Sequence, residues 1–104
     1  MTFIGHVYAA SAKYPRTEQY GLIDQIRRAA VSIALNIAEG SGAGTDKEFA
    51  RFLQISFRSI YEVITAAEIA IRLGFGAKSD QESLIRESDE LAAMIIGFMK
   101  TLRG

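Results

Sequence analysis

Two predicted helices meet at Glu39-Gly40-Ser41-Gly42-Ala43-Gly44-Thr45-Asp46-Lys47-Glu48, the segment that decides the fold. Three glycines within five residues predict a turn, because glycine readily adopts the backbone angles that end a helix. Thr45 and Glu48 have the spacing of a capping box, in which each side chain accepts a hydrogen bond from a backbone amide at the helix start. One helix is therefore expected to end at Glu39, and another to begin at Thr45.

The single proline and a second glycine turn predict the remaining helix boundaries. Pro15 ends a first helix, because its ring clashes with the preceding turn. Gly74-Phe75-Gly76 ends the third helix, and Ser79 to Glu82 repeats the capping-box spacing. We therefore expect four helices, at about 2–14, 18–39, 45–73 and 79–103, with Arg103 as the last helical residue.

Apolar residues recur at alternating spacings of three and four in the third and fourth predicted helices, the pattern of a helix with one buried stripe. The stripes comprise Phe49, Leu53, Ser56, Ile60, Val63, Ala67 and Ala70, then Leu84, Ser88, Leu91, Ile95, Phe98 and Leu102. Further apolar residues lie beside both stripes, a surplus that suits a subunit interface. The chain is predicted to be an all-α, antiparallel up-down four-helix bundle, a single domain over residues 1–104, that associates with copies of itself.

The first helix is the short member of the predicted bundle. At 1.5 Å per residue it spans about 20 Å, whereas the other three span about 33 to 42 Å. Part of the bundle would therefore contain only three helices. We expect either that contacts in an oligomer cover this part, or that Met1 lies inside a longer natural helix.

Composition excludes several classes of function. Lys and Arg total 12, as do Asp and Glu, so the chain has no net field that would attract a polyanion. The absence of cysteine excludes thiolate zinc sites and thiol nucleophiles. No signal peptide and no apolar run long enough to span a bilayer is evident, so we expect a cytoplasmic protein with no membrane contact.

No catalytic, metal or cofactor site is predicted. His6 is the only histidine, so one chain cannot supply a histidine-pair metal site. The serines occupy predicted core or cap positions and have no evident base to activate them. The glycine turn lacks the Gly-Lys-Ser/Thr of a phosphate-binding loop, and it joins two helices rather than a strand and a helix.

Helix two carries a narrow polar stripe on an otherwise apolar helix. Plotted at 100° per residue, the stripe comprises Gln25, Arg28, Ser32, Asn36 and Glu39. One interpretation is a solvated stripe that forms hydrogen bonds between subunits; the other is a binding surface. Glu39 lies at a helix C-terminus, where a carboxylate is disfavoured, so we expect compensation from Arg28, Arg51 or the free amides that open the third helix.

Basic residues outnumber acidic ones in the first 58 positions by seven to five, and this excess reverses afterwards. Arg27 lies apart from the polar stripe, which makes it a candidate for an interface ion pair or a phosphate contact. The candidates for nucleic-acid or interface contacts are Arg16, Arg27, Arg28, Arg51 and Arg58.

Several ordered blocks resemble the four-helix-bundle proteins encoded in bacterial 23S rRNA intervening sequences. The blocks are Tyr14-Pro15-Arg16-Thr17-Glu18-Gln19-Tyr20-Gly21-Leu22, Gln25-Ile26-Arg27-Arg28-Ala29-Ala30-Val31-Ser32-Ile33, Asn36-Ile37-Ala38-Glu39-Gly40 and Lys47-Glu48-Phe49-Ala50-Arg51-Phe52-Leu53. The resemblance extends from about residue 7 to the C-terminus, with the fourth helix matching by pattern rather than by motif.

The resemblance implies a closed antiparallel bundle that assembles into a ring-shaped homopentamer. It also implies a nucleic-acid role, since members lie within rRNA insertions and a related branch, the accessory proteins of diversity-generating retroelements, is thought to bind nucleic acid and a reverse transcriptase through a basic surface. This chain departs from that branch in its zero net charge, and from the family in its shorter first helix. The expected partners are further copies of the chain and an RNA; the alternative hypothesis is a protein-interaction adaptor whose polar stripe docks a partner helix.

Overall fold

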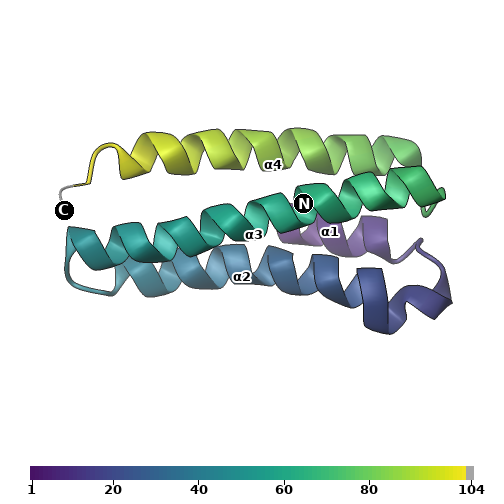
Figure 1. The fold of residues 1–104 in the computed structure, drawn as a ribbon, viewed down its shortest axis with the longest axis horizontal. Coiled ribbons are helices and arrows are strands. Elements are labelled where there is room, and N and C mark those ends of the chain that lie inside the picture. The colour runs from purple at the N-terminus through teal and green to yellow at the C-terminus, as the bar shows by residue number, and fades with distance from the viewer. Residues whose placement is uncertain (103–104) are drawn as a thin grey trace.

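The computed structural model of the protein describes residues 1–102 and shows four α-helices and no strand among them. The helices are α1 Phe3–Ser11, α2 Asp24–Ser41, α3 Asp46–Leu73 and α4 Lys78–Met99. They pack side by side into a helical bundle of 44 × 23 × 22 Å. α1 lies beside only one half of the longer helices, and the turn between α2 and α3 lies at the other end (Figure 1). The expected short first helix is confirmed.

The start of α3 forms half of the predicted capping box. Thr45 Oγ1 accepts a 3.1 Å hydrogen bond from the Glu48 amide, as a capping threonine should. The Glu48 carboxylate does not reach back, because it accepts a 3.1 Å hydrogen bond from Arg51. This hydrogen bond, together with the positive charge of Arg51, lowers the pKa of Glu48. The predicted helix start is confirmed, while the reciprocal bond of the box is not formed.

α2 does not stop before Gly40 but continues to Ser41. Gly40 is buried where α2 crosses α3, and an added Cβ would lie 2.7 Å from Phe49 Cδ1 and 2.8 Å from Phe52 Cβ. Gly40 therefore allows α2 and α3 to pack closely, and it does not terminate α2. Gly74, by contrast, ends α3 as predicted, with a φ of 71° that places it in the left-handed region.

The predicted start of helix two at Glu18 is wrong by six residues. Residues Arg16–Glu18 form a 3₁₀ turn and Gln19–Ile23 a π-helical turn, so the regular helix begins only at Asp24. The break lies at Gly21, whose φ of −111° and ψ of −109° are not helical. The Glu18 carboxylate accepts a 3.2 Å hydrogen bond from the Leu22 amide, which stabilises the irregular turn.

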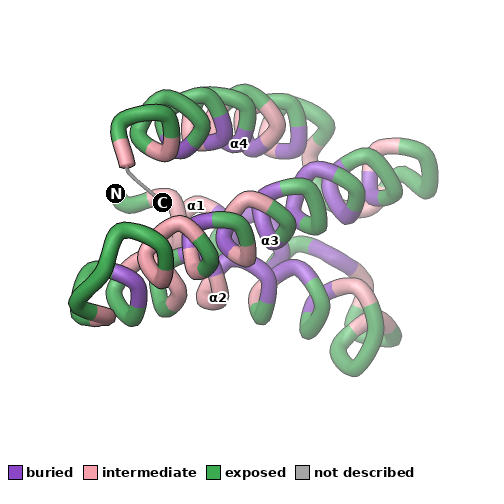
Figure 2. The backbone as a smooth tube through the Cα atoms, turned by 60° about the vertical axis from the view of Figure 1, so that its left-hand side comes forward, coloured by how far each residue is buried: buried purple, intermediate pink, exposed green. Residues whose placement is uncertain are grey.

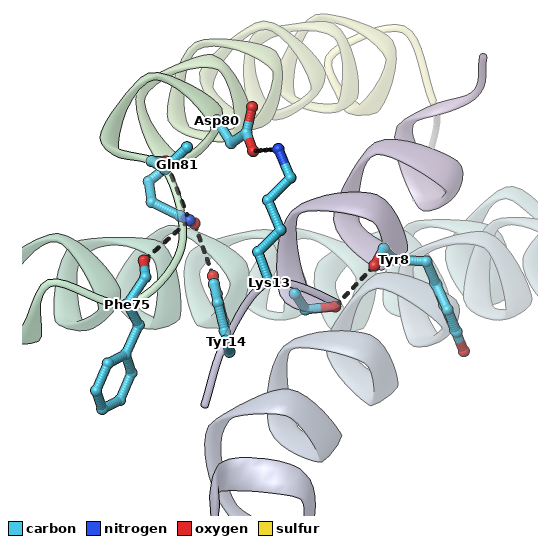
Figure 3. A network of polar contacts seen from close by, with 8 residues as sticks. Tyr8, Lys13, Tyr14, Phe75, Asp80 and Gln81 are labelled. Atoms are coloured by element: carbon cyan, nitrogen blue, oxygen red, sulfur yellow. Dashed lines mark hydrogen bonds and ion pairs between the residues drawn. The ribbon is translucent and has the colours of Figure 1, made fainter. Parts of the chain in front are cut away.

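The predicted capping box at the start of α4 is also wrong. α4 begins at Lys78, and its N-cap residue Ala77 has no side-chain cap. The two residues between Ser79 and Glu82 form tertiary contacts: Asp80 binds Lys13 at 2.9 Å, and Gln81 accepts a hydrogen bond from Tyr14 at 2.6 Å (Figure 3). At the other end α4 stops at Met99, and the predicted last residue Arg103 lies outside the described residues.

The core lies between the inward faces of all four helices (Figure 2). Ile26 of α2, Ile60 of α3 and Leu84 of α4 are at most 1% exposed, and burial of each such side chain contributes about 1.5 to 3 kcal/mol. The predicted α3 stripe is buried from Leu53 to Ala70. The periodicity of α3 therefore predicted its inward face correctly.

The predicted α4 stripe is buried over only part of its length. Leu84, Ser88 and Ile95 are buried, Leu91 is half-buried and Phe98 is 47% exposed. The stripe becomes exposed because α1 does not extend along the C-terminal part of α4, so no fourth helix covers that part (Figure 1).

Candidate functional site

The polar stripe of α2 lies where α2 meets α3, and Ser32 is the centre of a small hydrogen-bonded cluster there. Ser32 Oγ accepts hydrogen bonds from Ser59 Oγ of α3 at 2.9 Å and from Asn36 Nδ2 at 3.1 Å. Asn36 Nδ2 also donates to the Ser32 carbonyl oxygen at 2.8 Å. Part of the stripe thus joins two helices of one chain, which neither a solvated stripe nor a binding surface predicted.

Three adjoining hollows run from α3 across α2 to Tyr8 of α1, and together we call them the α2–α3 surface. The central hollow, of about 290 Å³, is lined by Gln25, Arg28 and Ser32 with Ser59 and Glu62. It shares Gln25 and Glu62 with a hollow of about 400 Å³, and Arg28 and Ser32 with one of about 440 Å³. The flanking hollows add Leu22, Arg58, Tyr61, Thr65, Ala66 and Ile69 on one side, and Tyr8, Asp24, Arg27, Val31, Leu35 and Asn36 on the other.

Three of the predicted arginines, Arg27, Arg28 and Arg58, line this surface, and of these Arg28 and Arg58 are exposed. The Arg28 side chain is 79% exposed and stands 3.5 Å from the Asp24 carboxylate, a surface pair that contributes little to stability. Glu62 lines the same hollow as Arg58. Both guanidinium groups are therefore available to an anionic or a protein partner, but each has a carboxylate nearby.

Arg27 has a different environment, because it connects α2 to α1. Its Nε donates to Ser11 Oγ at 2.9 Å, and its terminal nitrogen donates to the Tyr8 carbonyl oxygen at 3.3 Å. Its guanidinium carbon also lies 4.5 Å from the centre of the Tyr8 ring, a favourable cation–π geometry. The structure therefore places Arg27 in the packing of α1 rather than free for phosphate.

Arg16 and Arg51 lie at opposite ends of the bundle, away from the α2–α3 surface. Arg16 is in the 3₁₀ turn that follows α1, and Arg51 is in the first turns of α3, where it binds Glu48 and stacks 4.9 Å from the Phe52 ring. Glu39 is exposed, and within residues 1–102 its carboxylate forms no ion pair with either expected arginine. The five predicted arginines therefore do not form one patch.

The contacts between α1 and α4 were not predicted from the sequence. His6 Nδ1 lies 2.8 Å from a Glu87 carboxylate oxygen, and Lys13 Nζ lies 2.9 Å from Asp80. Between these two contacts lies a hollow of about 310 Å³. The sequence indicates only that Lys13 and Asp80 both lie near helix ends. That does not predict that these two residues pair with each other.

Neither the α2–α3 surface nor the hollow between α1 and α4 shows an arrangement of residues that indicates a catalytic or metal site. Among the residues that it describes, no three His, Cys, Asp or Glu side chains are grouped so that they could hold a metal ion. Across the same residues, none of the helices combines the length and apolar character needed to traverse a bilayer.

Comparisons with known proteins give one family match and one similar solved structure. A family model described as 23S rRNA-intervening sequence protein matches residues 1–97. A crystal structure of a protein with unknown function from the S23 ribosomal protein family of Bacteroides thetaiotaomicron VPI-5482 superimposes with a TM-score of 0.77 at 24% sequence identity, covering 96% of this chain and 100% of that one. No curated protein matches the sequence significantly. The structural likeness supports the fold.

Proposed function

Because the chain belongs to the family of 23S rRNA-intervening sequence proteins, we propose that it is a non-enzymatic scaffold that assembles with copies of itself and contacts RNA. In this proposal the protomer is an antiparallel up-down bundle, and the assembly is a ring-shaped homopentamer in the cytoplasm. The resemblance noted in the sequence suggests the ring and the RNA, and the α2–α3 surface provides a place for both.

The observation that carries the proposal is the exposure of large apolar side chains on the α2–α3 surface. Leu35 is 59% exposed, Tyr61 50% and Ile69 39%, each lining one of the three hollows. Exposure of these three side chains to water does not stabilise a monomeric bundle, whereas their burial against a neighbouring subunit is favourable. Tyrosine and arginine among aliphatic residues is also a composition enriched at protein interfaces.

RNA contact is proposed for Arg28 and Arg58 at the same surface. Phosphate contacts require exposed cations, and these two guanidinium groups lie in adjoining hollows. The charge of the whole chain is balanced, so such a contact is local and does not extend over the whole protein.

The test is binding of the purified protein to total cellular RNA across a salt series, with oligomer mass measured by light scattering in the same samples. The proposal predicts an oligomer at micromolar concentration, and RNA affinity that falls steeply as salt rises. A stable monomer would contradict the assembly, and an oligomer that binds no RNA at low salt would contradict the RNA role.

A pair of charge-reversal variants locates the contact. The double variant Arg28→Glu/Arg58→Glu should lose at least tenfold in RNA affinity while it keeps its helical content. The control Arg16→Glu/Lys47→Glu changes the net charge equally at the two ends of the bundle and should retain more of the affinity. Equal losses in both doubles would show that RNA responds only to net charge and would remove the α2–α3 surface from the proposal.

A second candidate function is the adaptor that docks a partner helix. It is favoured by the hollow of about 400 Å³, in which the side chains of Leu22, Tyr61 and Ile69 lie beside Arg58 and Glu62. An assembled protein without RNA affinity that captures a defined partner through this hollow would favour it, and Tyr61→Glu should then abolish capture.

A further inference from the structure

The side chain of Asn36 is held in one orientation by hydrogen bonds within α2. Its Nδ2 donates to the Ser32 carbonyl oxygen at 2.8 Å and to Ser32 Oγ at 3.1 Å. A carbonyl oxygen can only accept, so the nitrogen of the amide, and not its oxygen, must face Ser32. Ser32 Oγ is itself held by a 2.9 Å hydrogen bond from Ser59 of α3. The structure therefore fixes both the position and the orientation of the Asn36 amide.

The oxygen of the same amide is free. Asn36 Oδ1 forms no hydrogen bond with any of residues 1–102, whereas the nitrogen is already engaged. Within that range Ser88 Oγ is the one buried side-chain nitrogen or oxygen atom that lacks a partner, so the unpaired Asn36 Oδ1 is open to solvent. Asn36 thus offers a fixed hydrogen-bond acceptor to any partner that brings an N–H or O–H donor.

Asn36 lines a hollow of about 440 Å³ whose other residues suit the remaining parts of a nucleotide. Arg28 lines the same hollow with a side chain that is 79% exposed, so it can contact a phosphate, although the Asp24 carboxylate stands 3.5 Å from it. Leu35, which is 59% exposed, and Val31 provide apolar area against which the face of a flat ring can pack. The hollow therefore combines a cation, an apolar contact and an oriented acceptor.

We propose that Asn36 Oδ1 accepts a hydrogen bond from the exocyclic amino group of an unpaired RNA base in this hollow. The inference rests on the RNA contact proposed above and adds a specificity to it, because phosphate contacts position a strand whereas a base contact reads it. The base is unpaired because pairing in a duplex occupies its amino group, and proteins read RNA sequence mostly in single strands. Tyr61 and Ile69 line a different hollow and stay available to a neighbouring subunit.

The first experiment removes the amino group from the RNA and leaves the protein unchanged. The full chain is titrated at low salt against two fluorescein-labelled oligonucleotides of equal length, and binding is read as fluorescence anisotropy. One is built of adenosine, and the other of purine riboside, which is adenosine without its amino group. Both carry the same backbone charge, so the phosphate contacts contribute equally. We expect the purine riboside oligonucleotide to bind about fivefold more weakly, the effect of one lost hydrogen bond.

The two proposals fail in different ways in this experiment. Equal affinities for the two oligonucleotides would overturn the base contact and leave the RNA contact of Arg28 and Arg58 standing. Binding of neither oligonucleotide at low salt would overturn the RNA contact and the base contact with it.

A pair of amide variants then assigns the preference to Asn36. Asn36→Ala removes the acceptor, so the affinity ratio of the two oligonucleotides should fall from about five to about one. Gln25→Ala is the matched control, because Gln25 is an exposed amide on the same surface that no hydrogen bond orients within the described part of the chain, and it should keep the ratio. An unchanged ratio in Asn36→Ala with native circular dichroism would overturn the inference. Asn36→Ser, whose hydroxyl can still bond the Ser32 carbonyl oxygen but is shorter, decides the matter in the same way if Asn36→Ala fails to fold.

Discussion

The Tyr14 hydroxyl donates a 2.6 Å hydrogen bond to Gln81 Oε1, joining the segment after α1 to the first turn of α4 (Figure 3). Gln81 is completely buried, and its amide nitrogen lies 3.4 Å from the carbonyl oxygens of Phe75 and Ala77. The Tyr14 ring also packs against the Phe75 ring, with centroids 6.3 Å apart. This small network fixes the end of the bundle where the turn between α3 and α4 meets Tyr14.

Removing that hydroxyl should destabilise the protein. Tyr14→Phe leaves Gln81 Oε1 buried without its donor, and an unsatisfied buried acceptor costs about 1 to 3 kcal/mol. The measurement is the free energy of unfolding in urea at pH 7. Tyr8→Phe is the control, because Tyr8 is 41% exposed and its ring contact with Arg27 survives, so it should change stability by less than about 0.5 kcal/mol.

The same tyrosine predicts a loss of stability at alkaline pH. Burial, and then the nearby charge of Asp80, raise the pKa of Tyr14 from 10.0 to about 12. Because the folded state favours the neutral phenol, this contribution is fully present below pH 10 and is lost as the pH rises from 10 to 12, amounting to about 2 to 3 kcal/mol.

Comparison of the wild type with Tyr14→Phe isolates this contribution from the other groups that titrate above pH 9. The wild-type advantage in unfolding free energy should be constant from pH 7 to 9 and should shrink between pH 10 and 12. An advantage that stays constant up to pH 12 would show that Tyr14 ionises as readily in the folded chain as in the unfolded one.

Gly40→Ala should destabilise the protein although alanine favours helices. The added Cβ would lie 2.7 Å from a Phe49 ring carbon and 2.8 Å from Phe52 Cβ, so α2 and α3 must separate. Overpacking of this kind costs about 1 to 3 kcal/mol and outweighs a helix-propensity gain of about 1 kcal/mol.

Thermal unfolding measures the effect, and Gly97→Ala is the control within the same protein. Gly97 lies in α4, and a Cβ added there would have no neighbouring atom within 4 Å, so alanine should raise stability by about 0.5 to 1 kcal/mol. Opposite signs at the two glycines are expected; stabilisation by both would show that α2 and α3 are not in close contact at Gly40.

Arg27 and Arg28 should differ in their effect on stability. Arg27→Ala removes two hydrogen bonds and a ring contact that fasten α1 to α2, and it should cost about 1 to 2 kcal/mol. Arg28→Ala removes only an exposed pair with Asp24 and should cost less than about 0.5 kcal/mol. Equal unfolding free energies for the two variants would argue against the fastening of α1 by Arg27.

The sequence by itself determined the elements that depend on near neighbours. The glycine turns, Pro15 and the Thr45 cap act within four residues, so they predicted the four helices and the shortness of the first. The period of α3 predicted its buried face for the same reason. Local signals erred at Gly21, where the chain forms an irregular turn, at Gly40, which packs against α3, and at the start of α4, where Asp80 and Gln81 form tertiary contacts.

Only the tertiary structure decided which distant residues meet. Tyr14 and Gln81 are 67 positions apart, and His6 and Glu87 are 81 apart, so their pairing depends on the register between packed helices and leaves no periodic trace in the sequence. The sequence placed Arg28 in the polar stripe and Arg27 outside it, but it could not tell which of the five arginines share a surface. Packing placed Arg27 against Tyr8, brought Arg28 and Arg58 to one surface, and left Arg16 and Arg51 at the ends, because a side chain's neighbours are set by the helix opposite it.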